Sequence, residues 1–207
     1  MTEDKLTAEM LSVPTLGPVR YESPLRRKFQ SGDGVYNFTP DTARLLLHAD
    51  FAAEQEIRPE LSFEKAGPRE RIFFDPEQTT AAIVTCGGLC PGLNNVIRSV
   101  FLQLHHNYGV TRVLGIRYGY YGLNPAHGLP PLLLTMEMVE SIHKLGGTIL
   151  GTSRGPEDPR VMVDFLEKQR VNILFPVGGD GTQRGAHEIA AEARRRGLPL
   201  AVVGIPK

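Results

Sequence analysis

The sequence predicts an α/β fold for residues 80–207: a doubly wound (Rossmann-like) parallel sheet with helices on both faces. From about residue 80, segments of strand length alternate with segments of helical pattern, which is typical of a parallel sheet. The strand segments contain continuous apolar runs, as expected where both faces of a sheet are covered. Glycine-rich loops follow three of the predicted strands, at residues 87–88, 151–155 and 178–181.

Residues 1–79 are predicted to form an irregular N-terminal extension to this domain. Three prolines interrupt the first 27 residues, and residues 31–34 (Ser-Gly-Asp-Gly) predict a turn. Residues 40–54 predict a helix because apolar side chains recur there at spacings of three and four. Residues 71–74 predict a short strand. We expect this extension to pack on the domain or on a neighbouring subunit.

The first half of the domain begins with a buried strand at residues 81–85 (Ala-Ala-Ile-Val-Thr) and a loop at residues 86–92. Residues 93–106 predict a helix, and residues 112–117 predict a second strand. The helix is predicted from the broad apolar face that is formed by Val96, Ile97, Val100, Phe101 and Leu104.

The second half continues the alternation. A helix is predicted at residues 136–145 with Thr135 as its N-cap, and a short strand at residues 148–150. Another helix begins at Glu157 or Asp158 and extends to about residue 170. The remaining predicted elements are a strand at residues 172–177, a helix at 183–196 and a strand at 200–205.

Composition excludes several classes of protein. The 207 residues contain 23 Lys and Arg and 23 Asp and Glu, so the net charge of zero gives no reason to expect a nucleic-acid or anionic-membrane partner. Two cysteines are too few for a disulfide framework and favour a cytoplasmic location. No apolar run approaches the length of a membrane span, and no signal peptide is evident.

The loop Gly178-Gly179-Asp180-Gly181-Thr182 gives the first indication of chemistry. A glycine-rich turn between a strand and a helix presents backbone N–H groups to an anion such as phosphate. A carboxylate alone would repel phosphate, so Asp180 is predicted to bind the Mg²⁺ that accompanies it. The alternative is a tight turn in which Asp180 is only the helix N-cap.

The other two loops strengthen this hypothesis, because loops at the carboxyl ends of parallel strands open on one crevice. Arg154 could stabilise charge during phosphoryl transfer, or it could be a surface residue paired with Glu157 or Asp158. Gly87 and Gly88 could receive a phosphate tail, or they could serve only a tight turn. Neither the dinucleotide fingerprint nor a Walker A sequence is present.

Four segments in this order and spacing resemble the 6-phosphofructokinases, and the ATP-dependent plant and related bacterial branch in particular. The segments are Thr-Cys-Gly-Gly-Leu-Cys-Pro-Gly-Leu-Asn at 85–94, Gly-Thr-Ser-Arg-Gly at 151–155, Gly-Gly-Asp-Gly-Thr at 178–182 and Gly-Ile-Pro-Lys at 204–207. Phe-Glu-Lys-Ala-Gly-Pro-Arg at 63–69 also matches. The resemblance covers about residues 60–207.

The resemblance implies transfer of the ATP γ-phosphate to fructose 6-phosphate in glycolysis, with Mg²⁺ as cofactor and a homo-oligomeric full-length protein. It implies that Asp180 binds Mg²⁺ and that Arg154 stabilises the transferred phosphate. Gly181 resembles the position that selects ATP, whereas Lys207 is usual in pyrophosphate-dependent relatives. The residues that it places at ATP are Gly88, Arg154, Gly155, Gly179, Asp180, Gly181 and Thr182.

In the resembling family, the catalytic base lies just after the position of Lys207, in a segment that this sequence does not contain. The domain is therefore expected to be incomplete at its C-terminus, to carry the ATP and Mg²⁺ half, and to be inactive alone. Alternatives are a pyrophosphate-dependent phosphofructokinase and a non-catalytic nucleotide-binding subunit. An NAD or lipid kinase would also carry Gly-Gly-Asp-Gly-Thr, but the other segments argue against it.

Overall fold

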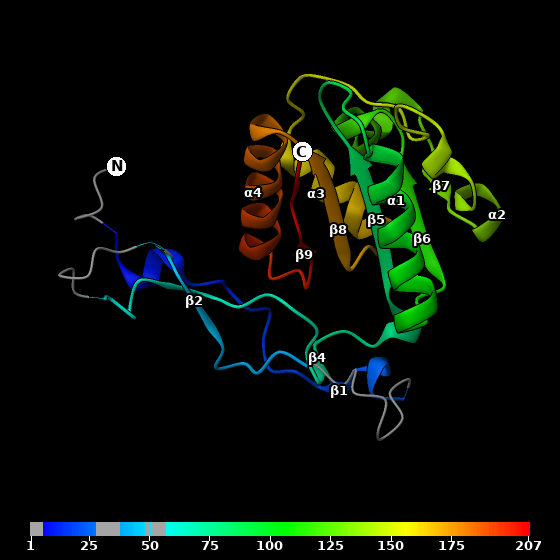
Figure 1. Ribbon diagram of the computed structural model, residues 1–207. Coiled ribbons are helices and arrows are strands. Elements are labelled where there is room, and N and C mark those ends of the chain that lie inside the picture. Colours follow the sequence, from blue (N-terminus) through cyan, green and yellow to red (C-terminus); the bar gives the residue numbers. More distant parts are fainter. Residues whose placement is uncertain (1–5, 28–37, 49, 51–56) are drawn as a thin grey trace. The chain divides into compact units, whose positions relative to one another are not determined.

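The computed structural model describes residues 6–27, 38–48, 50 and 57–207 (Figure 1). The chain divides into two compact units, Met1–Phe73 and Phe74–Lys207. The turn predicted at residues 31–34 lies outside the described residues. In the described part of the chain, no helix is both long and apolar enough to cross a membrane.

The first unit contains two small antiparallel sheets. Strand β1 (Tyr21–Glu22) pairs with β4 (Arg71–Ile72), and β2 (Arg44–Leu46) pairs with β3 (Ser62–Glu64). The strand predicted at residues 71–74 is thus confirmed in part. Two short 3₁₀ helices, η2 (Ala8–Leu11) and η3 (Pro24–Arg27), complete the described elements of this unit.

The helix predicted at residues 40–54 is wrong for the part that the structure describes, because β2 lies there. The guanidinium of Arg69 donates to the carbonyl oxygens of Thr39 and Pro40, both at 2.8 Å. The N–H of Lys65 donates to the carbonyl of Ala43 at 2.9 Å. Pairing with distant backbone and side-chain groups therefore overrides the local helical pattern. Residues 49 and 51–54 of the predicted helix lie outside the described residues.

The second unit is built on a mostly parallel sheet. Its strand order is β10-β8-β5-β6-β7, and β9 also pairs with β8. The main strands are β5 (Thr80–Thr85), β6 (Arg112–Ile116) and β8 (Ile173–Gly178), which confirm three predicted strands. The edge strand β7 (Leu132–Leu133) is antiparallel and was not predicted. After β6 and β7 the chain returns to the other side of β5, so the strand order reverses between β5 and β8.

Helices cover both faces of this sheet, as predicted (Figure 1). Ala82 and Val84 of β5 face the cluster that includes α3 (Pro159–Lys168) and α4 (Asp180–Arg195). Ala81 and Ile83 face the opposite cluster, which includes α1 (Leu93–Leu102) and α2 (Met136–Val139). All four β5 side chains are fully buried. Because β5, β6 and β8 are parallel, the loops that follow them leave the sheet at the same, carboxyl edge.

The helix predicted at residues 136–145 is much shorter. Thr135 caps it as predicted, but α2 ends at Val139, and a separate 3₁₀ turn, η8 (Ile142–Lys144), follows. Side chains of α1 bind carbonyl oxygens of this segment, including that of Glu140, which a longer helix would use. Arg98 Nε donates to Glu140 at 3.2 Å, and Asn94 Nδ2 donates to Leu145 at 3.0 Å.

The strand predicted at residues 148–150 is also wrong, because these residues make no strand pairing. The N–H of Ile149 donates instead to the side chain of Asn94, and the N–H of Gly151 donates to Thr148, which closes a turn. Buried Asn94 therefore replaces a strand neighbour for this segment. The loop at residues 151–155 consequently follows a turn and not a strand.

Three other boundaries differ from the predictions. Helix α4 begins at Asp180, three residues early, and α1 continues as a π-helix, η5 (Gln103–Tyr108). The strand predicted at 200–205 is split into β9 (Ala201–Val202) and β10 (Ile205–Pro206), both parallel to β8. The remaining 3₁₀ elements of the unit are η4 (Pro76–Gln78), η6 (Gly119–Leu123) and η7 (Pro125–His127).

Candidate nucleotide site

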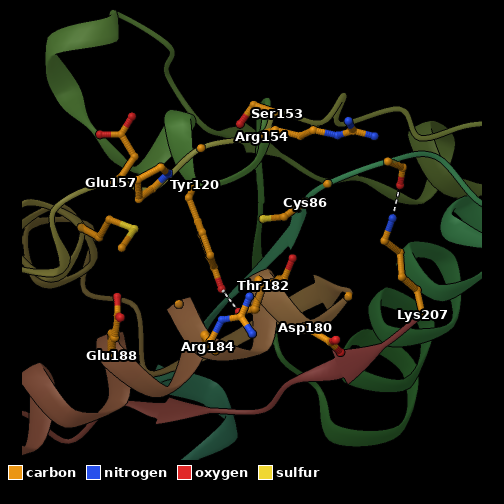
Figure 2. A pocket seen from close by; sticks show the side chains of 18 residues that line it. Cys86, Tyr120, Ser153, Arg154, Glu157, Asp180, Thr182, Arg184, Glu188 and Lys207 are labelled. Atoms are coloured by element: carbon orange, nitrogen blue, oxygen red, sulfur yellow. Dashed lines mark hydrogen bonds between the residues drawn. The ribbon is translucent and has the colours of Figure 1, made fainter.

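One cavity of about 510 Å³ lies at the carboxyl edge of β5 and β8. This is the point at which the strand order reverses, where open α/β sheets place their ligands. The cavity brings together all the residues that the sequence nominated: Gly88, Arg154, Gly155, Gly179, Asp180, Gly181, Thr182 and Lys207. Figure 2 shows Asp180, Thr182 and Lys207 on one side of it and Arg154 across from them.

The first wall is the turn from β8 into α4. Gly179 is the N-cap, with no side-chain cap, and its carbonyl accepts from the N–H groups of Thr182 and Gln183. Asp180 is therefore the first residue of the helix, and the alternative in which it is the N-cap is wrong. A side chain at Gly179 or Gly181 would meet no atom within 4 Å. The N-terminus of a sixteen-residue helix thus opens on free space, which suits an anion.

Gly178 is different from its two glycine neighbours in the loop. A Cβ placed there would lie 2.7 Å from the Cβ of Thr182, so no larger residue fits without a shift. The carbonyl of Gly178 also accepts from Gln183 Nε2 at 3.0 Å and from the N–H of Lys207 at 3.3 Å. Gly178 therefore fixes the turn, whereas Gly179 and Gly181 leave room for a ligand.

The second wall is the loop after β5. The N–H of Cys86 donates to Val177 at 2.9 Å, which ties this loop to the end of β8. Lys207 Nζ donates to the carbonyl of Gly88. A Cβ on Gly88 would lie 3.2 Å from Nη2 of Arg154, so the guanidinium lies directly beside this glycine. Two cations from different loops therefore meet at Gly88.

The third wall is the loop at residues 151–155, which reaches the cavity although no strand precedes it. Thr85 Oγ1 donates to the carbonyl of Gly151 at 2.8 Å. The N–H of Gly87 donates to Ser153 at 2.9 Å, and Thr152 Oγ1 donates to Gly87 at 2.6 Å. These three bonds anchor the loop to β5 and its following turn, and thereby set the position of Arg154.

Arg154 does not form the surface ion pairs that were its alternative explanation. Glu157 accepts instead from Asn124 Nδ2 at 2.8 Å and contacts His127 Nε2 at 3.0 Å. Asp158 caps α3 by accepting from the N–H of Arg160 at 2.9 Å. Among the residues that the structure describes, no carboxylate pairs with Arg154, and its guanidinium is available to a ligand.

Tyr120 forms the floor between these walls. Its hydroxyl donates to the carbonyl of Thr182 at 2.7 Å, and a Cβ on Gly185 would lie 2.5 Å from its ring. Burial raises the pKa of Tyr120, so the hydroxyl keeps its proton and remains a donor. Burial also raises the pKa of the neighbouring Cys86 thiol to about 12. Cys86 is thus a packed thiol and not a nucleophile.

The sequence analysis missed several residues that line the cavity. Arg184, Gly185 and Glu188 follow the Gly-Asp-Gly loop along α4, and Met162 and Pro156 come from the α3 side. The spacing of Asp180, Arg184 and Glu188 by four residues was the available signal, because it places all three on one helix face. A polar face on a helix is usually exposed to solvent, so this spacing alone did not predict that Arg184 and Glu188 line a cavity.

Asp180 fits a magnesium site that is shared with a phosphate. Within the described part of the chain, no group of three or more His, Cys, Asp or Glu side chains could hold a metal. Mg²⁺ does not need such a cage, since it is commonly bound by one or two carboxylates together with substrate phosphates. Asp180 is exposed to the cavity between two glycines, which leaves space for both.

Comparison with known proteins identifies the family. The family model described as Phosphofructokinase matches residues 80–207. The chain is 46% identical to an ATP-dependent 6-phosphofructokinase of Trypanosoma cruzi, over 99% of this chain and 42% of the relative. It is 57% identical to the protein of that name from Entamoeba histolytica, over 70% of this chain and 33% of the relative. The chain thus spans less than half the length of these relatives.

Solved structures share the fold. Phosphofructokinase of Saccharomyces cerevisiae matches with a TM-score of 0.52 at 25% identity, over 62% of this chain and 20% of that one. A pyrophosphate-dependent phosphofructokinase of Marinobacter aquaeolei matches with a TM-score of 0.56 at 19% identity, over 62% of this chain and 33% of that one. At that identity the second likeness concerns the fold alone. The family model and the sequence relatives together show that the chain belongs to the phosphofructokinase family.

Proposed function

We propose that this chain forms the donor-binding part of an ATP-dependent 6-phosphofructokinase, with residues 80–207 as its nucleotide-binding domain. The whole enzyme would transfer the γ-phosphate of ATP to fructose 6-phosphate and give ADP and fructose 1,6-bisphosphate. The observation that carries the proposal is the convergence of three loops on one cavity, at the reversal of strand order. We assign no sugar-binding residue and no base to this chain.

Each wall has a role in holding the donor. Backbone N–H groups at the start of α4 would bind phosphate oxygens, and Gly179, Gly181 and Gly155 would let them approach. Arg154 beside Gly88 would neutralise charge on the transferred phosphoryl group. Asp180 would hold Mg²⁺, which offsets the charge of the phosphates when it is bound.

The length of the cavity favours ATP over pyrophosphate. The lining continues along α4 from Asp180 to Glu188, which is about 12 Å of helix at 1.5 Å per residue. Apolar surface of Tyr120, Met162 and Pro156 lines the same cavity as the charged Arg184 and Glu188, so the far part along α4 is not purely a phosphate site. A pyrophosphate bound at the helix N-terminus would leave it empty, whereas a nucleoside would fill it.

Gly181 provides a test of the nucleotide site. A Cβ in place of Gly181 would meet no atom within 4 Å, and a carboxylate carried on it would repel the phosphates of a nucleotide. We expect Gly181→Asp to keep the fold and to weaken binding of Mg²⁺–ADP to the 207-residue chain by at least about tenfold. Calorimetric titration measures this, and undiminished ADP affinity in the variant would contradict the proposal.

A pyrophosphate-dependent enzyme is the second candidate, and Lys207 is the observation that favours it. Its ammonium group lies at Gly88, where it could bind a terminal phosphate. Titration of the unaltered chain with Mg²⁺–pyrophosphate and with Mg²⁺–ADP separates the two candidates. Tighter pyrophosphate binding, with no measurable ADP binding, would replace the first proposal by the second.

A further inference from the structure

One face of α4 carries charges of alternating sign along the cavity. Asp180, Arg184 and Glu188 are four residues apart, so they lie one above another on the same side of the helix. All three line the cavity, and Figure 2 shows Arg184 between the other two. Arg184 therefore lies about 6 Å along the helix from Asp180, in the direction away from the N-terminus.

Arg184 pairs with neither carboxylate, although both are at the spacing that favours an ion pair within a helix. Within the described residues, no carboxylate lies within ion-pair distance of its guanidinium. The other end of the same helix behaves differently. There Glu192 contacts Arg195 at 2.8 Å and Arg196 at 2.6 Å. The unpaired guanidinium is thus a local property of the cavity face.

Contacts with Tyr120 position the backbone of α4 on both sides of Arg184. Tyr120 bonds to the carbonyl of Thr182, and its ring packs against Gly185, so contacts on both sides fix this turn of α4. Beyond it along the helix, Glu188 also lines the cavity, about 12 Å of helix from Asp180. Along α4, Arg184 therefore lies between the helix N-terminus, where the terminal phosphates are proposed to bind, and Glu188.

We propose that Arg184 binds the α-phosphate of the nucleotide, the phosphoryl group that links the nucleoside to the two terminal phosphates. Guanidinium presents a planar set of donors that matches phosphate oxygens. Pyrophosphate has no third phosphoryl group, so this contact would favour nucleoside triphosphates over pyrophosphate. The inference rests on the proposed function, because it assumes that the terminal phosphates bind at the start of α4.

The test is a calorimetric comparison of three Mg²⁺ complexes on the 207-residue chain: ATP, tripolyphosphate and pyrophosphate. We expect Arg184→Gln to weaken ATP and tripolyphosphate by about tenfold or more, since a bond to a charged group is lost. Pyrophosphate affinity should change less than about twofold. Arg184→Lys should recover part of the loss, because it keeps the charge but not the planar donors.

Arg194→Gln is the matched control. Arg194 lies on α4 near its last turn, is exposed and does not line the cavity, so this substitution should leave all three affinities unchanged. Equal weakening of pyrophosphate by Arg184→Gln would overturn the assignment, as would loss of ATP affinity without loss of tripolyphosphate affinity. Failure of the unaltered chain to bind ATP would instead contradict the proposed function.

Discussion

The hydroxyl of Tyr120 donates to the carbonyl oxygen of Thr182 at 2.7 Å and so joins the floor of the cavity to the first turn of α4. We expect Tyr120→Phe to lower the free energy of unfolding by about 1 kcal/mol, because one buried hydrogen bond is lost while the ring remains. Urea denaturation measures this. Tyr121→Phe is the control, since Tyr121 is exposed and stacks on His127 through its ring. An equal effect of the two substitutions would contradict the prediction.

Adjacent glycines in the β8–α4 turn should respond differently to the same substitution. Gly178→Ala should lower the free energy of unfolding by roughly 1–3 kcal/mol, since the new methyl group would press on Thr182. Gly179→Ala meets open space and should cost at most about 1 kcal/mol, from the poorer N-cap. Denaturation curves of the two variants provide the comparison. The prediction fails if Gly179→Ala is the more destabilising.

Asp180→Asn tests the magnesium site. In the unaltered chain, Mg²⁺ should strengthen ADP binding, because the metal joins the carboxylate to the phosphates. In the variant this gain should fall by about tenfold, since a neutral amide is a weak ligand for Mg²⁺. ADP titrations with and without Mg²⁺ measure the gain in each protein. A gain of the same size in both would show that another group binds the metal.

Glu192 should make stability depend on pH in acid. Hydrogen bonds from Arg195 and Arg196 lower the pKa of Glu192 from 4.5 to about 2. A lowered pKa in the folded state means that the contribution is complete above about pH 4.5 and is lost as the pH falls toward 2. Glu192→Gln should therefore be less stable than the unaltered chain at pH 6, and the difference should shrink by pH 3.

Urea denaturation at both pH values measures this difference. Glu77→Gln provides the control, because Glu77 forms no ion pair in the described part of the chain. A difference between Glu192→Gln and the unaltered chain that is independent of pH would contradict the assignment.

The sequence pattern predicted the central strands of the sheet, whose apolar composition is a local feature. The strands predicted at residues 81–85 and 172–177 are mostly apolar on both faces. Such runs are typical of strands that are covered on both faces of a parallel sheet. The predictions failed where partners distant in the sequence decide. Asn94 and Arg98 bind the backbone of residues 140–149, and Arg69 binds that of residues 39–40. A pattern within one segment holds no information about such partners.

The residues predicted for the site line one cavity, and the sequence singled them out because they lie in glycine-rich turns, which have a recognisable composition. Even the loop around Arg154, which follows no strand, reaches the cavity through Thr85 and Gly87. Arg184 and Glu188 were missed because only the orientation of α4 makes their face part of the cavity. The oligomeric state and the cytoplasmic location remain predictions.

The charged side chains that line the cavity are three cations, Arg154, Arg184 and Lys207, and three anions, Asp180, Glu157 and Glu188. Their formal charges cancel, so the site produces little long-range field to attract an anion from solution. The association rate of a nucleotide should accordingly vary little with ionic strength. Selectivity among donors would then depend mainly on the dissociation rate of the bound donor and not on its association rate.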